Sequence, residues 1–102
     1  MIDVNFEYND VKASGDLEQF ATEKLNKLTD KYEFIVRADV YFKLENTPTN
    51  ETGKISEIKI SVPGSNLFAD SSKENFKMSF ADAIDKVKRQ LEKRKDKMQA
   101  HH

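Results

Sequence analysis

The most informative part of this chain is the sequence SFADAIDKVKRQLEKRKDKM at residues 79–98. Its apolar residues recur at spacings of four, three, four and seven, at Phe80, Ile84, Val87, Leu91 and Met98. These spacings keep the five side chains on one narrow side of a helix. With Asn75 as its cap, the pattern predicts a helix over residues 75–98, about 35 Å long at about 1.5 Å rise per residue.

The same helix carries a row of cations on roughly the opposite side, at Lys86, Arg89, Lys93 and Lys97. Like charges four residues apart repel one another by roughly a few tenths of a kcal/mol, so this spacing does not favour the helix by itself. Such a row can bind a polyanion. Lys and Arg are also good helix formers near a helix C-terminus, and charged faces are commonly only solvated. The pattern alone leaves both interpretations open.

The net charge of −1 conceals an uneven distribution. Residues 73–102 hold nine Lys and Arg against five Asp and Glu, a balance of +4, whereas residues 1–72 hold eight against 13, a balance of −5. Nucleic acid binding depends on where positive charge gathers rather than on the total. The C-terminal third is therefore the candidate site for a polyanion.

A chain of 102 residues without Cys predicts a single domain with no disulfide, thiol nucleophile or thiolate metal site. No apolar run approaches the length of a membrane span, and the N-terminus lacks a basic region followed by an apolar segment. We therefore expect a cytoplasmic protein that does not contact a membrane. The only His residues, His101 and His102, are interpreted as a tag remnant or a disordered end. We expect no metal and no cofactor.

The first half of the chain predicts a strand, a helix and a second strand. Residues 1–8 alternate, with four apolar side chains on one side, at Ile2, Val4, Phe6 and Tyr8. Ser14 is a candidate N-cap for a helix that runs to about Lys31, with an apolar stripe at Leu17, Phe20, Ala21, Leu25 and Leu28. Alternation returns in a strand whose apolar side is Val36, Ala38, Val40, Phe42 and Leu44.

The second half predicts two further strands before the long helix. A loop at residues 45–53 leads to a strand with Ile58, Ile60 and Val62 on one side, then a turn at residues 63–66 and a short fourth strand at residues 67–71. The order β-α-β-β-β-α predicts an α+β fold with both helices on one face of a four-stranded sheet. Tyr41 is the only aromatic residue that we place on the other face, so RNA would be bound by helix and loop cations rather than by stacking on the sheet.

The C-terminal run also identifies a family. Residues 84–98, IDKVKRQLEKRKDKM, resemble the run Ile-Asp-Lys-Leu-x-Arg-Gln-Leu-x-Lys-x-Lys-Asp-Lys of the bacterial ribosome hibernation-promoting factors and the related ribosome-associated inhibitor, protein Y. Residues 17–28, LEQFATEKLNKL, are similar to the first helix of that family. The resemblance covers essentially the whole chain. It implies a fold similar to double-stranded-RNA-binding domains.

The resemblance implies a factor that binds the small ribosomal subunit over the messenger and tRNA sites and represses translation under stress or in stationary phase. It implies no enzymatic activity and no small-molecule substrate. Its partners would be the small subunit and its ribosomal RNA, and a second hibernation factor on the ribosome remains open. The residues that it places against RNA are Lys24 and Lys27 on the first helix and Lys86, Arg89, Lys93, Lys95 and Lys97 on the second. Lys88 and Arg94 fall where family members vary and carry less weight.

The sequence also departs from the family. Asn75-Phe76-Lys77 stands where members often have Asp-Met-Tyr, which keeps a cap but replaces the aromatic residue. The chain ends at His102, without the extra C-terminal domain of long hibernation factors or the acidic tail of protein Y. We therefore expect the short form, a single ribosome-binding domain over residues 1–102, with residues 1–98 ordered and residues 99–102 a frayed tail.

Two other classes of function stay open. An enzyme would need a nucleophile with a base in reach or a metal with placed ligands, and residues 63–66 lack a Gly-rich phosphate motif. A different binding module could be a generic double-stranded-RNA binder, or a protein adaptor that uses the polar sheet face. An adaptor should depend on Tyr41 or Arg37 rather than on the last helix.

Overall fold

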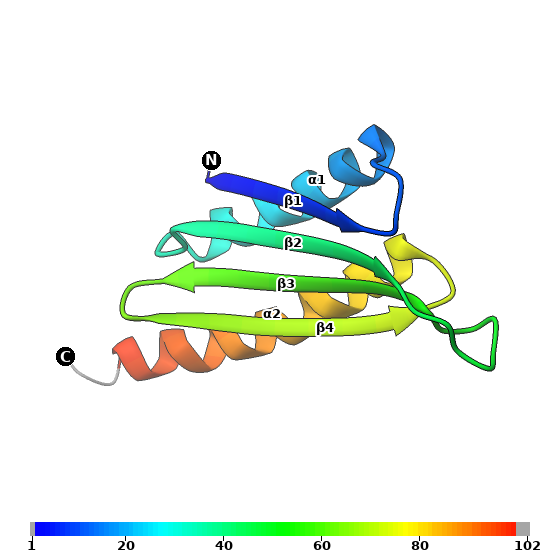
Figure 1. The fold of residues 1–102 in the computed structure, drawn as a ribbon. Coiled ribbons are helices and arrows are strands. Elements are labelled where there is room, and N and C mark those ends of the chain that lie inside the picture. The colour runs from blue at the N-terminus through cyan, green and yellow to red at the C-terminus, as the bar shows by residue number, and fades with distance from the viewer. Residues whose placement is uncertain (1, 100–102) are drawn as a thin grey trace.

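A computed structural model describes residues 2–99 of the chain, with side chains described as far as residue 96. Six elements follow one another, as Figure 1 shows: β1 (Asp3–Asn9), α1 (Gly15–Lys31), β2 (Arg37–Leu44), β3 (Lys54–Val62), β4 (Ser65–Lys73) and α2 (Phe76–Gln99). This order confirms the predicted β-α-β-β-β-α fold. Gln99, which we expected in a frayed tail, ends α2, and the rest of that tail, His101 and His102 included, lies outside the described residues.

The four strands form one sheet in the order β1-β2-β3-β4. β1 is parallel to β2, and the other neighbouring pairs are antiparallel. Parallel neighbours need a long crossover connection, which α1 provides. Both helices lie on the same face of the sheet (Figure 1), as the sequence predicts.

The core lies between this face and the two helices. The central strands bury Ala38, Val40 and Phe42 of β2 and Ile58, Ile60 and Val62 of β3. Against them pack Leu17, Ala21, Leu25 and Leu28 of α1 and Phe80, Ile84, Val87 and Leu91 of α2. The apolar stripes predicted for both helices are therefore confirmed, except for the side chain of Met98, which lies outside the described side chains.

The ends of β2 differ from the prediction. Val36 and Leu44 continue its apolar alternation, yet Val36 is 59% exposed and Leu44 is 46% exposed. Val36 still donates its backbone N–H to Ser61 at 2.8 Å, so pairing continues where cover by the helices has ended. Alternation reports which face a side chain points to, and burial also needs an element packed over that face.

The hairpin between β3 and β4 is tighter than predicted. Val62 pairs directly with Ser65, so only Pro63 and Gly64 connect the strands. Gly64 has a φ of 79°, a left-handed conformation that glycine adopts without strain. The tight connection lets β4 pair with the whole of β3, and β4 is therefore longer than the predicted residues 67–71.

Aromatic residues on the outer face of the sheet were undercounted. Leu67 and Ala69 of β4 pack toward the core, so Phe68 between them points outward and is 63% exposed. The prediction that Tyr41 is the only aromatic residue on this face is wrong. The outer face carries two aromatic rings.

Candidate nucleic-acid interface

The two helices lie side by side over the sheet, and an open groove of about 280 Å³ runs between them. Four of its lining residues are cations, Lys24, Lys27 and Lys31 of α1 and Lys88 of α2. Its apolar lining is Leu28, Ala81 and Ile84, and Asp85 is the only acidic residue of the lining. The groove is thus a concave surface with an excess of positive charge.

Core packing sets the direction of these lysines. In α1, Lys24, Lys27 and Lys31 stand at positions i, i+3 and i+7, which share one side of a helix. Leu28 of the same helix is buried, and burial of that residue orients the row beside it. In α2, Lys88 directly follows the buried Val87, which turns it toward α1.

Phe20 supports the first of these lysines. The ammonium of Lys24 lies 5.2 Å from the centre of the Phe20 ring, and that of Lys77 lies 5.5 Å from it. Such contacts attract a cation to the face of an aromatic ring. Lys77 also pairs with Asp16 at 2.8 Å, which joins the first turns of α1 and α2. The N-terminal part of the groove is therefore held by contacts that link both helices.

At the other end of α1, the carboxylate of Glu92 lies among the cations and accepts a hydrogen bond from the hydroxyl of Tyr32. Burial and the hydrogen bond to Glu92 raise the pKa of Tyr32. The same hydrogen bond, with the charges of Lys31 and Lys95, lowers the pKa of Glu92. The ammoniums of Lys31 and Lys95 lie 5.3 and 6.0 Å from the Tyr32 ring. Lys95, predicted to face RNA, is thus placed near the C-terminal end of α1.

Arg89 and Lys93 form the outer side of α2. Both are exposed, and neither makes a hydrogen bond or ion pair with a residue whose side chain the structure describes. They are available to an external anion. Lys97 belongs to α2, and its side chain lies outside the described side chains.

Lys86 lies apart from the other predicted cations. Its ammonium donates a 2.8 Å hydrogen bond to the backbone carbonyl of Asp70 on β4 and lies 3.5 Å from the carboxylate of Asp82. A hydrogen bond from Ser71 and the charge of Lys86 lower the pKa of Asp82. Lys86 is therefore engaged at the edge of the sheet, although the sequence places it in one row with Arg89 and Lys93.

Two further α2 side chains bind this edge in the same way. Gln90 donates to the carbonyl of Phe68 at 2.7 Å, and Arg94 donates to the carbonyl of Pro63 at 2.7 Å. With Lys86 they stand four residues apart, which is the repeat of one helix side. Lys86 and Gln90 bind carbonyls of the edge strand β4 that would otherwise be unpaired, and Arg94 binds one in the turn before it.

Sequence reasoning missed two residues of the groove. Lys31 lies seven residues after Lys24, a helical repeat visible in the sequence. Lys88 carries less weight in the sequence-based prediction. Its position directly after Val87, an apolar residue of the helix, could have indicated that it lies next to the packed side of α2. Of the seven predicted cations, the structure brings Lys24 and Lys27 together in the groove.

Within residues 2–99, no three His, Cys, Asp or Glu side chains are grouped so as to hold a metal ion. In the same part of the chain, neither helix combines the length and the apolar character needed to cross a bilayer.

Two solved structures share this fold over most of the chain. A ribosomal subunit interface protein from Coxiella burnetii superposes with a TM-score of 0.80 and 20% sequence identity, over 94% of this chain and 99% of that chain. The N-terminal domain of Thermus thermophilus Protein Y superposes with a TM-score of 0.75 and 14% identity, over 89% of this chain and 97% of that chain. These likenesses establish the fold. No curated protein matches the chain significantly in sequence.

A family comparison covers nearly the whole chain. Residues 4–99 match the family described as Sigma 54 modulation protein / S30EA ribosomal protein. The match includes both helices, all four strands except Asp3, and every described cation of the groove. The chain therefore belongs to the Sigma 54 modulation protein / S30EA ribosomal protein family.

Proposed function

We propose that this protein binds the small ribosomal subunit over its messenger and tRNA sites, through the cations of α1 and α2, and thereby represses translation under stress or in stationary phase. The observation that carries the proposal is the groove in which Lys24, Lys27, Lys31 and Lys88 converge from two helices. A solvated charged face would not need cations of separate elements to meet in one concave surface.

Family membership supports the same conclusion. The family is one of ribosome-associated factors and not of enzymes. A similar structure carries the name ribosomal subunit interface protein. Ribosomes work in the cytoplasm, which is where we expect this protein to act.

The geometry favours backbone recognition. From Lys24 to Lys31 the helix rises about 10 Å, and a duplex presents several phosphates over that length. Lysine contacts to phosphates position a protein without reading sequence. Selectivity would then come from the shape of a folded RNA channel, which a groove between two rigid helices can match.

Repression would follow from overlap rather than chemistry. A domain that occupies the decoding region excludes messenger and tRNA from the same space. Arg89 and Lys93, exposed beside the groove on α2, would extend the contact to further phosphates. Lys95 and Lys97 would continue it toward the C-terminal end of the helix.

Co-sedimentation with purified small subunits tests this proposal, with naked duplex RNA as competitor. The groove variant carries Lys27→Glu and Lys88→Glu. Its matched control carries Lys54→Glu and Lys59→Glu, which change the net charge equally on β3, outside the groove. We expect saturable binding that resists the duplex, is lost in the groove variant and is retained in the control.

Two results would contradict the proposal. If naked duplex RNA competes the protein off the small subunit, the protein is a generic double-stranded-RNA binder. Equal binding by the groove variant and its control would mean that the lysine groove is a solvated surface.

A further inference from the structure

The outer face of the sheet carries a second concave surface, far from the lysine groove. A shallow depression of about 470 Å³ is lined by Tyr41 of β2, by residues 57–59 of β3 and by residues 68–70 of β4. Both helices lie on the opposite face, so no helix covers it (Figure 1). Phe68 is the most exposed large apolar side chain of the described residues, at 63%. Exposed aromatic residues in a hollow are typical of an interaction site.

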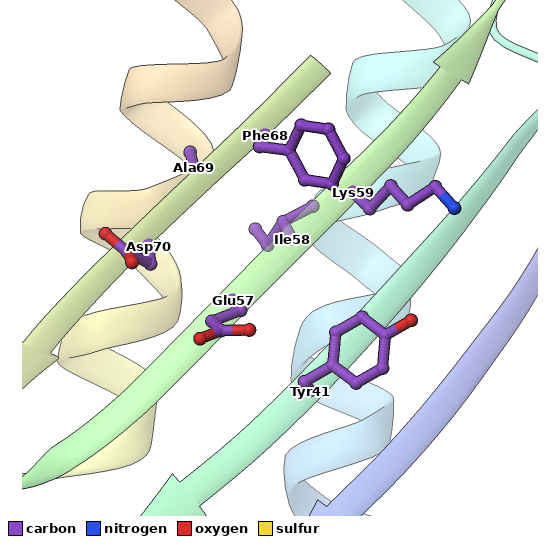
Figure 2. A pocket seen from close by; sticks show the side chains of 7 residues that line it. All are labelled: Tyr41, Glu57, Ile58, Lys59, Phe68, Ala69 and Asp70. Carbon is purple, nitrogen blue, oxygen red and sulfur yellow. The ribbon is translucent and has the colours of Figure 1, made fainter. Parts of the chain in front are cut away.

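The two aromatic rings stand over different strands. Phe68 lies directly opposite Lys59 across β3 and β4, and Tyr41 lies directly opposite Glu57 across β2 and β3. Figure 2 shows the two rings on either side of β3, with the floor of Ile58 between them. Both rings line the depression.

Two carboxylates close the other side of the depression. Glu57 and Asp70 are direct partners in the ladder between β3 and β4, and both point outward. Like charges directly opposite one another destabilise a sheet. Lys43 pairs with Glu57 at 2.9 Å, whereas the exposed Asp70 carboxylate makes no hydrogen bond or ion pair with the described side chains. A bound cation would relieve this repulsion.

The charge of the whole outer face has the same sign. The alternation of the four strands directs five acidic side chains outward, against three basic ones: Asp3, Glu7, Asp39, Glu57 and Asp70 against Arg37, Lys43 and Lys59. Burial first, and then the charges of Asp39 and Glu7, raise the pKa of Tyr41. A face of this charge disfavours RNA, although it offers two rings on which bases could stack.

We propose that this outer face docks a basic, arginine-bearing peptide segment of a partner protein. The guanidinium group of one arginine would stack on Phe68 or Tyr41 and pair with the carboxylates of Glu57 and Asp70. A guanidinium group suits this site because it stacks on aromatic faces and binds carboxylates in a planar, bidentate geometry. Lys59, whose ammonium points away from the two carboxylates in Figure 2, would not block the site.

Peptide docking on the outer face is independent of the proposed ribosomal function. The groove offers positive charge on the helical face, and the outer face offers negative charge and aromatic rings. The protein could therefore hold RNA by one face and a protein segment by the other.

A titration of the ¹⁵N-labelled full chain, followed by backbone amide shifts, tests the proposal. The probe is a short synthetic peptide with two arginines flanking a leucine, and the matched peptide has citrulline in place of each arginine. Citrulline keeps the shape of the side chain and removes its charge. We expect saturable shifts at residues 57–59 and 68–70 with the arginine peptide, and binding weaker by about tenfold or more with the citrulline peptide.

Variants show whether the depression itself binds the peptide. Asp70→Asn removes one charge with little change of shape, and Phe68→Ser removes the exposed ring; both should weaken binding. Asp30→Asn on α1 removes a charge that is also exposed but lies outside the site, and it should leave binding unchanged. The dispersion of the amide spectrum reports whether each variant is folded.

Four outcomes would overturn the proposal. Equal binding of the two peptides would exclude recognition of arginine charge, and unchanged binding by Asp70→Asn would exclude this acidic pair. Shifts of the same amides with protein concentration alone would assign the face to a second copy of the chain. Shifts of the same amides with oligouridylate would assign it to RNA.

Discussion

The hydroxyl of Tyr32, the residue that follows α1, donates a 2.6 Å hydrogen bond to the carboxylate of Glu92 on α2. Sixty residues separate the two in the chain. The bond therefore joins the C-terminal end of the first helix to the second helix, at one end of the lysine groove. It adds a polar contact to the core packing that holds the two helices side by side.

Replacement of this hydroxyl should be visible in the titration of its partner. In Tyr32→Phe, the pKa of Glu92 should rise toward the ordinary glutamate value, because its largest stabilising contact is lost. The melting temperature should fall by a few degrees. Carboxylate titration by NMR measures the first effect, and an unchanged Glu92 pKa would contradict the role of this bond.

The same pair gives stability a defined pH dependence. The pKa of Glu92 is lowered on folding, so its contribution is present above the ordinary glutamate pKa and is lost as pH falls through the lowered value. The pKa of Tyr32 is raised, so its contribution is present below the ordinary tyrosine pKa and is lost as pH rises through the raised value. Urea unfolding across pH should therefore give greatest stability between these two regions. In Tyr32→Phe, the loss of stability at low pH and the loss at high pH should both shrink. If both losses were unchanged in this variant, they would arise from other titrating groups.

The cap of α2 should carry a measurable share of stability. The side-chain oxygen of Asn75 accepts a 2.9 Å hydrogen bond from the backbone N–H of Met78. Asn75→Ala should lower the free energy of unfolding by about 1 kcal/mol. Asn75→Asp keeps the acceptor and places a negative charge at the positive end of the helix, so it should be neutral or stabilising. Urea unfolding compares the two, and equal losses would mean that the side-chain bond does not cap the helix.

Glycines at two positions should respond in opposite directions to alanine. Gly53 has a φ of 110°, and a Cβ there would lie 2.7 Å from the carbonyl oxygen of Glu45, so Gly53→Ala should destabilise the protein by more than about 1 kcal/mol. Gly15 begins α1 with nothing within 4 Å of such a Cβ, so Gly15→Ala should stabilise it by about 0.4–1 kcal/mol. Thermal unfolding of both variants checks this pair, and a harmless Gly53→Ala would mean that the loop relaxes freely.

Lys86 and Lys88 provide a comparison within one helix turn. Lys88 lines the groove, whereas Lys86 is engaged with Asp70 and Asp82 at the edge of β4. Lys88→Met should therefore weaken binding to the small subunit more than Lys86→Met, and Lys86→Met should instead loosen the edge of β4. Affinity measurements and hydrogen exchange at residues 68–70 separate the two roles. A larger loss of affinity in Lys86→Met would favour the single row of cations predicted from the sequence.

The fold and the family could be predicted from the sequence because local signals agree with the final packing. Alternation marks the strands, the four buried seam residues of α2 recur at helical spacing, and Ser14 and Asn75 cap the helices as predicted. The run at residues 84–98 identified the family that the comparison over residues 4–99 confirms.

The arrangement of the cations could not be predicted in the same way. A helical projection places Lys86 within an exposed row, but it does not show that this residue lies beside β4, an edge strand whose Asp70 carbonyl accepts its hydrogen bond. Lys31 and Lys88 line one groove only because α1 and α2 pack side by side. The two helices are distant in sequence, and their placement depends on how both pack on the sheet. Phe68 was missed for a related reason, since its exposure depends on the face that β4 presents.

The salt dependence of binding to the purified small subunit tests the central claim most directly. Each phosphate contact adds about 0.7–0.9 to the slope of log affinity against log salt concentration. The neutral groove variant Lys27→Gln with Lys88→Gln should therefore bind more weakly than the unmodified chain, with a slope shallower by about 1.4–1.8. The unchanged affinity and slope of this variant would contradict the account, because the groove would then make no contact with ribosomal phosphates.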